Sequence, residues 1–216
     1  MNKSVRAERN ERSEWGRSAF AAIVAICVCI ALLTGAWVWL SPRIAAQREH
    51  ARLLELADVL PPALYDNDPL TDRIEVRDPL LGSDQPQPIL RARLHGEPTA
   101  LVLQAVAPNG YGGPITLRIG IRYDGSIIAA RVLEQHETPG IGDLIEHAKS
   151  DWIEQFRSRS LRDPHEDKWK LRKDGGDFDQ LAGATVTPRA VVAAVGKALR
   201  FYGENRRRLF ATTNRP

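Results

Sequence analysis

The chain has 216 residues and a formal net charge of +3 at pH 7. This length suits one domain with additional segments, and the mild, mixed charge argues against a nucleic-acid partner. The two cysteines, Cys27 and Cys29, form no Cys-x-x-Cys pair, which argues against thiolate zinc sites and cysteine-ligated iron–sulfur clusters within this chain.

An uncharged apolar run, "AFAAIVAICVCIALLTGAWVWL", occupies residues 19–40. Its length is sufficient to cross about 30 Å of hydrocarbon, and Trp37 and Trp39 near its end suit a membrane interface. A cleaved signal peptide is the alternative, but its apolar region would be shorter and would precede a small-residue cleavage site. The excess of Lys and Arg before the run predicts a cytoplasmic N-terminus and a periplasmic remainder at the inner membrane.

A linking segment follows the apolar run. Residues 43–60 carry leucines on one face and charges on the other, which predicts a helix that stops at Pro61 and Pro62. The sequence up to residue 88 is rich in Pro and Asp, and only "DRIEVRD" within it suggests a short strand.

From Ile89 onward the pattern is typical of β-strands. The stretches "ILRARLHG" and "TALVLQAVA" have alternating or β-branched apolar residues. The clearest unit lies at residues 115–134, where apolar residues alternate from Ile115 to Tyr123. Asp124 and Gly125 predict a two-residue turn with positive φ, so residues 115–123 and 126–134 are expected to form an antiparallel hairpin.

The remaining elements are predicted to be mainly helical. Asp143 is expected to cap a helix at residues 144–157, and "WKLRKDGG" suggests a strand. Thr187 is a good cap for a last helix that begins near Pro188 and ends near Tyr202. The basic residues after it form a solvated end in the simplest interpretation, with a lipid or partner contact as the alternative.

Consecutive strands followed by helices predict an α+β fold with a mainly antiparallel sheet and packed helices, preceded by one N-terminal transmembrane helix. No Gly-x-Gly-x-x-Gly motif or Walker loop opens a helix. The predicted organisation is a cytoplasmic N-terminus (1–18), a transmembrane helix (19–40), a linker (41–88), a periplasmic domain (89–203) and a basic tail (204–216).

Three glycine-bearing loops could bind a ligand, at residues 109–114, 136–143 and 175–188. Glycine allows a close approach of the backbone to a ligand, but each loop alone is equally well explained as a turn. The third loop runs into a helix N-terminus, which favours an anion. Thr185 lies at that place. Its free hydroxyl is a poor nucleophile, but a phosphate esterified to it would be stabilised there.

Two other chemistries are poorly supported, so we predict neither a catalytic residue nor a metal site. The spacing of the acidic and histidine side chains between residues 136 and 147 matches no metal-binding pattern, and solvated residues explain it better. The chain has no Gly-x-Ser-x-Gly motif, which argues against a serine hydrolase.

Four ordered motifs, "HETPGIGD", "KSDWIEQF", "KDGGDFDQ" and "AGATVTPRAVVAAV", resemble the G subunit of the Rnf electron-transport complex. The related C subunit of the sodium-pumping NADH:quinone oxidoreductase has the same kind of FMN-binding domain, but the residues of "KDGGDFDQ" and "TPRAVV" favour Rnf. The resemblance implies FMN bound covalently through its phosphate to Thr185, installed from FAD by a flavin transferase. Asp179 matches an upstream acidic position, whereas Ala182 replaces the usual Ser or Thr.

The resemblance also implies the flavin contacts and the role of the chain. An electron-transfer subunit within a ferredoxin:NAD+ oxidoreductase coupled to Na+ or H+ transport would assemble with the Rnf A, B, C, D and E subunits in membrane lipid. A tethered binding or assembly module without redox activity is the alternative. The implied contacts are Glu137, Thr138, Pro139, Gly140, Ile141 and Gly142 in one loop, and Gly183, Ala184, Val186 and Thr187 around the attachment residue.

Overall fold

The computed structural model describes residues 34, 37 and 56–211 of the chain. The part from Leu54 to Pro216 forms one compact unit. The predicted transmembrane span lies outside the described residues except for Thr34 and Trp37, as does most of the predicted linker helix. Within the described residues, no helix combines the length and the apolar character needed to cross a membrane.

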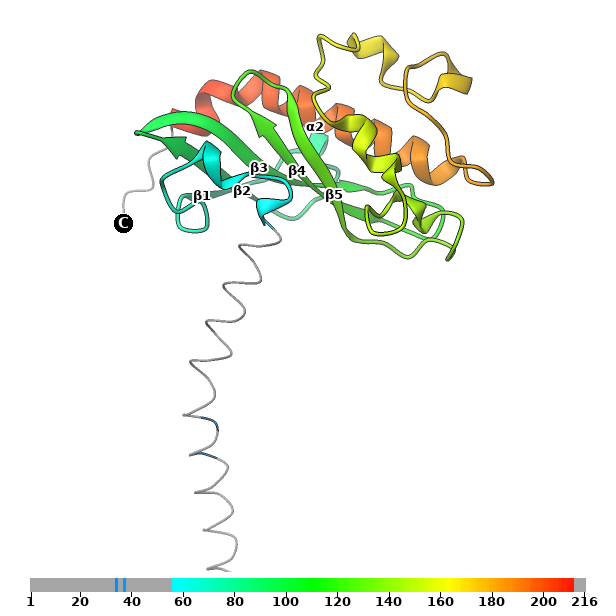
Figure 1. Ribbon diagram of the computed structural model, residues 1–216, viewed down its shortest axis with the longest axis horizontal. Helices are drawn as coiled ribbons and strands as arrows, with labels where there is room; N and C mark the ends of the chain where they lie inside the picture. Colours follow the sequence, from blue (N-terminus) through cyan, green and yellow to red (C-terminus); the bar gives the residue numbers. More distant parts are fainter. Residues whose placement is uncertain (1–33, 35–36, 38–55, 212–216) are drawn as a thin grey trace, which may run out of the picture. The chain divides into compact units, whose positions relative to one another are not determined.

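Five antiparallel strands form a single sheet in the order of the sequence (Figure 1). Each strand pairs with the next one along the chain, so the prediction of an α+β fold with an antiparallel sheet is confirmed. The predicted strands around residues 73–76, 89–96 and 99–107 are also confirmed. The strands are β1 (Arg73–Val76), β2 (Gln87–Leu94), β3 (Glu97–Ala107), β4 (Ile115–Arg122) and β5 (Ile127–Glu134).

The predicted hairpin is formed by β4 and β5, but its turn differs from the prediction. The Arg122 amide donates to the Ser126 carbonyl at 2.8 Å, so residues 123–125 form the loop, and only Gly125 within it has a positive φ, 95°. This arrangement is typical of a type I turn followed by a left-handed glycine. The two-residue turn with two positive φ angles lies instead between β2 and β3, at His95 and Gly96.

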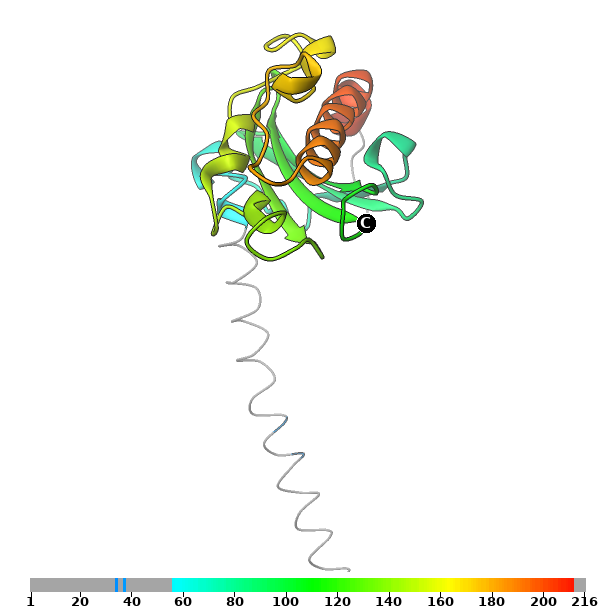
Figure 2. The same ribbon diagram turned by 90° about the vertical axis from the view of Figure 1, so that its right-hand side faces the viewer.

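One long helix, α2 (Val186–Ala211), packs against one face of the sheet (Figure 2). The helix is longer than predicted at both ends, and the sequence around Arg206, predicted to be a tail, is helical. Arg91 and Arg93 of β2 explain why the C-terminal end of α2 extends further than predicted, because their guanidinium groups donate to the carbonyls of Leu209 and Phe210. The predicted apolar face is confirmed as buried: Val191, Val192, Val195, Ala198, Leu199 and Tyr202.

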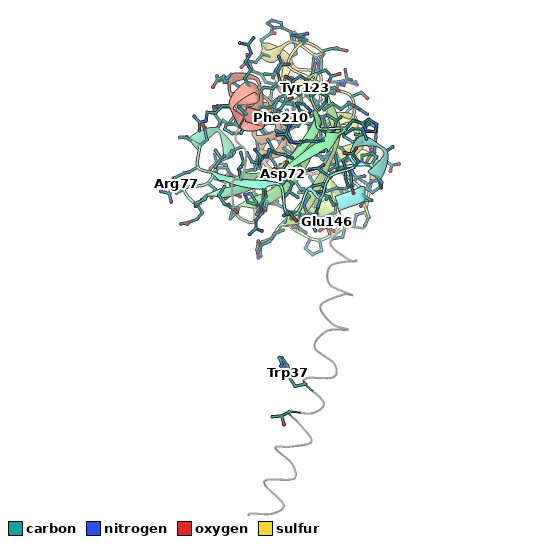
Figure 3. The ribbon with its side chains drawn as sticks, turned by 90° about the vertical axis from the view of Figure 1, so that its left-hand side faces the viewer. Trp37, Asp72, Arg77, Tyr123, Glu146 and Phe210 are labelled. Carbon is teal, nitrogen blue, oxygen red and sulfur yellow. The ribbon has the colours of Figure 1, made fainter. Side chains whose placement is uncertain are left out.

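The end of α2 is also held by aromatic packing. Tyr123, which follows β4, and Phe210 lie together in Figure 3, with their ring centroids 5.4 Å apart in an edge-to-face arrangement. The Tyr202 hydroxyl donates to the Tyr123 carbonyl at 2.9 Å. Burial raises the pKa of Tyr202, so this hydroxyl remains protonated and continues to donate.

The segment between β5 and α2 differs most from the predictions. The expected helix at residues 144–157 is wrong, because two short 3-10 helices, η3 (Asp143–Ile145) and η4 (Asp151–Phe156), occupy its place. Ser150 separates them by accepting a hydrogen bond from the Trp152 amide, which begins η4. The expected strand at residues 169–176 is also wrong, since that stretch holds the 3-10 helix η6 (Arg172–Asp174).

The opposite face of the sheet is covered by residues 56–60, just before η1 (Pro62–Leu64). Leu56, Val59 and Leu60 are buried there in a second apolar cluster. Gly120 of β4 permits this contact, because a Cβ at residue 120 would lie 1.9 Å from the Val59 carbonyl oxygen. The sheet is therefore covered on both faces.

We expect Gly120→Ala to lower the free energy of unfolding of the full-length chain by about 1–3 kcal/mol, because the new methyl group forces the Val59 backbone away from the sheet. Urea unfolding measures the change. The matched control is Gly203→Ala in α2, where a Cβ meets nothing within 4 Å; this change should stabilise the helix by about 0.5–1 kcal/mol. Equal stability of Gly120→Ala and wild type would contradict the close contact.

Candidate functional site

Three segments far apart in the sequence meet in a pocket at the N-terminal end of α2. Its volume is about 460 Å³, within the range of small-molecule and cofactor sites. The pocket includes all of the predicted site residues except Pro139 and Gly140, which lie in the same loop. Its lining consists of Tyr111, Glu137, Thr138, Ile141, Gly142, Gly183, Ala184, Thr185, Val186 and Thr187.

Glu137 joins the three segments from the inside. Its side chain is buried, and one carboxylate oxygen accepts a hydrogen bond from the Gly112 amide at 3.0 Å. The other oxygen accepts a hydrogen bond from the hydroxyl of Thr187. A buried carboxylate needs such donors, so Glu137 fixes both the loop at 109–114 and the start of α2 relative to its own loop.

Two glycines allow the backbones to approach Glu137 and its neighbours. A Cβ at Gly112 would lie 1.8 Å from the His136 carbonyl oxygen, and a Cβ at Gly142 would lie 2.9 Å from Glu137 Oε2. Both distances are shorter than any side chain tolerates. The glycines in these loops therefore have packing roles that a turn by itself would not require.

The predicted cap role of Thr187 is wrong, and the cap position belongs to Thr185. Because α2 begins at Val186, Thr187 is inside the helix and is not its cap; its hydroxyl is buried against Glu137. Thr185 directly precedes the helix, and its carbonyl accepts the Arg189 amide at 3.3 Å, so Thr185 occupies the N-cap position. Its half-buried hydroxyl accepts a hydrogen bond from Lys173 Nζ at 2.6 Å.

Three large apolar side chains are unusually exposed at this pocket. Tyr111 is 73% exposed, Ile141 43% and Val186 44%. Exposed apolar side chains that gather at one concave place mark a binding surface better than scattered ones do. Tyr111 was not among the predicted contacts, although its position between glycines in "NGYGGP" was a signal for it. The pocket therefore offers a flat ligand an apolar surface beside a hydroxyl and a cation.

Asp143 was predicted to cap a helix, but it stabilises its own loop instead. Its carboxylate accepts the Gly140 amide at 2.7 Å and lies 2.9 Å from Lys149 Nζ. The hydrogen bond from Lys149 lowers the pKa of Asp143, and the pKa of Lys149 is raised in turn. Both groups are therefore charged at neutral pH, and they maintain the turn that presents Ile141.

Asp179, the upstream acidic residue, lies outside the pocket lining. It is exposed, and its carboxylate lies 2.9 Å from Arg172 Nη1. Its carbonyl accepts a hydrogen bond from the Trp152 indole at 2.7 Å. In the described part of the chain, no three His, Cys, Asp or Glu side chains converge in a manner that could bind a metal ion.

We expect Thr187→Val to reduce the free energy of unfolding by about 1–3 kcal/mol, because it removes a donor from a buried carboxylate. Valine has nearly the same shape, so the packing should be retained. Thr187→Ser restores the hydroxyl and should recover most of the loss. Urea unfolding of the full-length variants measures this effect, and a Thr187→Val protein as stable as wild type would show that Glu137 does not depend on this contact.

Comparison with known proteins places the pocket within a recognised domain. Residues 110–200 match the family described as FMN-binding domain. The chain is 52% identical over 170 residues to the G subunit of the ion-translocating oxidoreductase complex of Pseudomonas aeruginosa strain UCBPP-PA14, covering 78% of this chain and 79% of the relative. It is 45% identical to the G subunit from Vibrio atlanticus, covering 76% and 79%. It is 37% identical to that from Vibrio cholerae, covering 89% and 93%.

Proposed function

This chain belongs to the family of G subunits of ion-translocating oxidoreductase complexes and carries an FMN-binding domain, and from this premise we propose that FMN is attached covalently to Thr185 and relays electrons within an Rnf-type complex. One observation supports this most strongly. Thr185 lines the same pocket as the exposed side chains of Tyr111, Ile141 and Val186. An attachment point and an apolar surface for a flat ring therefore adjoin.

The residues of the pocket suit FMN. When bound, FMN supplies the electron-transfer chemistry, so the protein needs no general acid or base. Tyr111, Ile141 and Val186 would contact the ring system and exclude water from it. The amides of Val186 and Thr187 at the start of α2 favour the negative charge of a phosphate.

Thr185 is a better attachment residue than Thr187 for a physical reason. Thr187 is 1% exposed and its hydroxyl is committed to Glu137. Attachment there would leave the buried carboxylate without this donor and would require room for a phosphate inside the core. Thr185 is half-buried at the rim of the pocket, where a transferase and FAD can reach its hydroxyl.

We also propose how the chain assembles and where it is located. Family membership supports association with the other components of the complex, which in an Rnf-type assembly are the A, B, C, D and E subunits, and maturation by a flavin transferase. Residues 19–40 would anchor the chain in the inner membrane once, with the flavin domain on the periplasmic side. The complex would couple its redox reaction to transport of Na+ or H+.

Thr185→Asn tests the attachment. Asparagine is a good N-cap residue, so the helix start should be retained, but it has no hydroxyl to esterify. After co-expression with an active flavin transferase, the wild-type chain should carry the FMN mass on the peptide containing Thr185, and Thr185→Asn should carry none. Thr187→Ser is the control and should remain flavinylated at Thr185. Detection of the FMN mass on residue 187, or of covalently bound flavin in Thr185→Asn, would refute the assignment.

Reporter fusions test the topology. A reporter that is active only outside the cytoplasm should be active when fused after Pro216, because the positive residues before the apolar run favour a cytoplasmic N-terminus. A reporter that is active only inside the cytoplasm should be silent at the same position. Deletion of residues 19–40 from the fusion is the control, and it should reverse the pattern, because the chain then remains in the cytoplasm. The reverse pattern of activity would place the domain in the cytoplasm.

A further inference from the structure

Lys173 lies at the proposed attachment residue although the sequence gives no reason to expect it there. Its side-chain nitrogen donates a hydrogen bond to Thr185 Oγ1 at 2.6 Å, across 12 residues of sequence. Lys173 is the middle residue of η6 (Arg172–Asp174), and its side chain is exposed. The contact therefore depends on where the fold places η6.

The backbone on both sides of Lys173 is fixed. Before it, Leu171 is buried and the Arg172 amide donates to the Phe178 carbonyl at 2.7 Å. After it, the Asp174 carboxylate accepts two hydrogen bonds from the Arg189 guanidinium, each of 2.9 Å. These bonds lower the pKa of Asp174 and raise that of Arg189, so both are charged at neutral pH. Because Arg189 lies in the first turn of α2, this ion pair holds η6 beside the start of the helix.

Two arginines near Thr185 are paired with carboxylates, whereas Lys173 is not. Arg189 pairs with Asp174, and Arg172 pairs with Asp179. Among the residues that the structure describes, Lys173 forms no salt bridge with a carboxylate, and its partner is the neutral hydroxyl of Thr185. An anion formed on this hydroxyl would therefore meet an uncompensated positive charge at hydrogen-bond distance.

The start of α2 offers fewer free backbone amides to a phosphate than the N-terminus of a helix normally does. Pro188 is the third residue of α2 and has no amide hydrogen. Only the amides of Val186 and Thr187 therefore remain in that turn to meet a phosphate. A charged ammonium group gives a hydrogen bond about twice as strong as a neutral donor does.

We propose that Lys173 is a positioning residue for flavinylation: it orients the Thr185 hydroxyl for transfer and then binds the phosphodiester that forms there. This inference rests on the proposed function, in which Thr185 is the acceptor. Thr185 Oγ1 forms a new bond to the flavin-side phosphorus of FAD, the bond from that phosphorus to the bridging oxygen breaks, and AMP leaves. The hydroxyl proton passes to a base of the transferase, and no electron is transferred. The product is a diester with one negative charge, which matches the single charge of Lys173.

The experiment follows flavinylation of the full-length chain, produced without flavin and mixed with purified transferase and FAD. Intact mass gives the initial rate. Lys173→Met should react at least about tenfold more slowly than wild type, because one charged hydrogen bond is lost. Lys173→Arg should recover most of the rate. Lys170→Met is the matched control, since Lys170 is an exposed lysine of the same segment that does not contact Thr185, and it should react at the wild-type rate.

A second measurement separates phosphate binding from a structural effect. The 31P resonance of the attached diester should differ between wild type and Lys173→Arg and should be the same in wild type and Lys170→Met. If wild-type protein is modified at Thr185 and Lys173→Met is flavinylated at the same rate, this inference is overturned and the proposed function remains intact. An unchanged resonance in Lys173→Arg would also overturn the binding role. Wild-type protein that is not modified at Thr185 would overturn the proposed function itself.

Discussion

The pocket depends on one buried carboxylate, that of Glu137. A buried carboxyl group is costly unless hydrogen-bond donors satisfy it, and here the donors are the Gly112 amide and the Thr187 hydroxyl. Each donor belongs to a different segment of the pocket. The requirement to satisfy one side chain therefore brings together a strand-connecting loop, the loop after β5 and the start of α2. Because Glu137 is buried, it shapes the pocket by holding these backbone segments in place.

The charges around the pocket are separated in a way that suits a ligand with an apolar ring and an anionic group. The acidic side chains Glu137 and Asp143 are already occupied by donors from their own surroundings. The wall that remains exposed is apolar, at Tyr111, Ile141 and Val186. At the rim, the described side chain that contacts Thr185 is Lys173, a cation without a carboxylate partner within salt-bridge distance. Repulsion between a carboxylate and a phosphate is thereby avoided.

The sequence predicted the features that depend on local patterns. Period-two alternation was sufficient for β4, because its alternate side chains are buried on one face, and the 3.6-residue pattern was sufficient for the buried face of α2. Local rules failed where a distant residue decides the outcome. Thr187 before Pro188 has the pattern of a helix cap, yet Glu137, 50 residues away, recruits the hydroxyl and the helix begins earlier. The contact of Lys173 with Thr185 could not be predicted, since it depends on how η6 packs.

The pocket is also connected to the other face of the sheet. Residues 56–60 pack on the face opposite α2, where Gly120 permits contact with the Val59 backbone. The pocket loops are joined to the same sheet through β4 and β5. The paired strands β4 and β5 therefore connect the Val59 contact to the loops of the pocket where the flavin would be attached. A flavin attached at Thr185 could change its position relative to Leu56 only if one of these contacts broke, so it would be held as a fixed part of the domain.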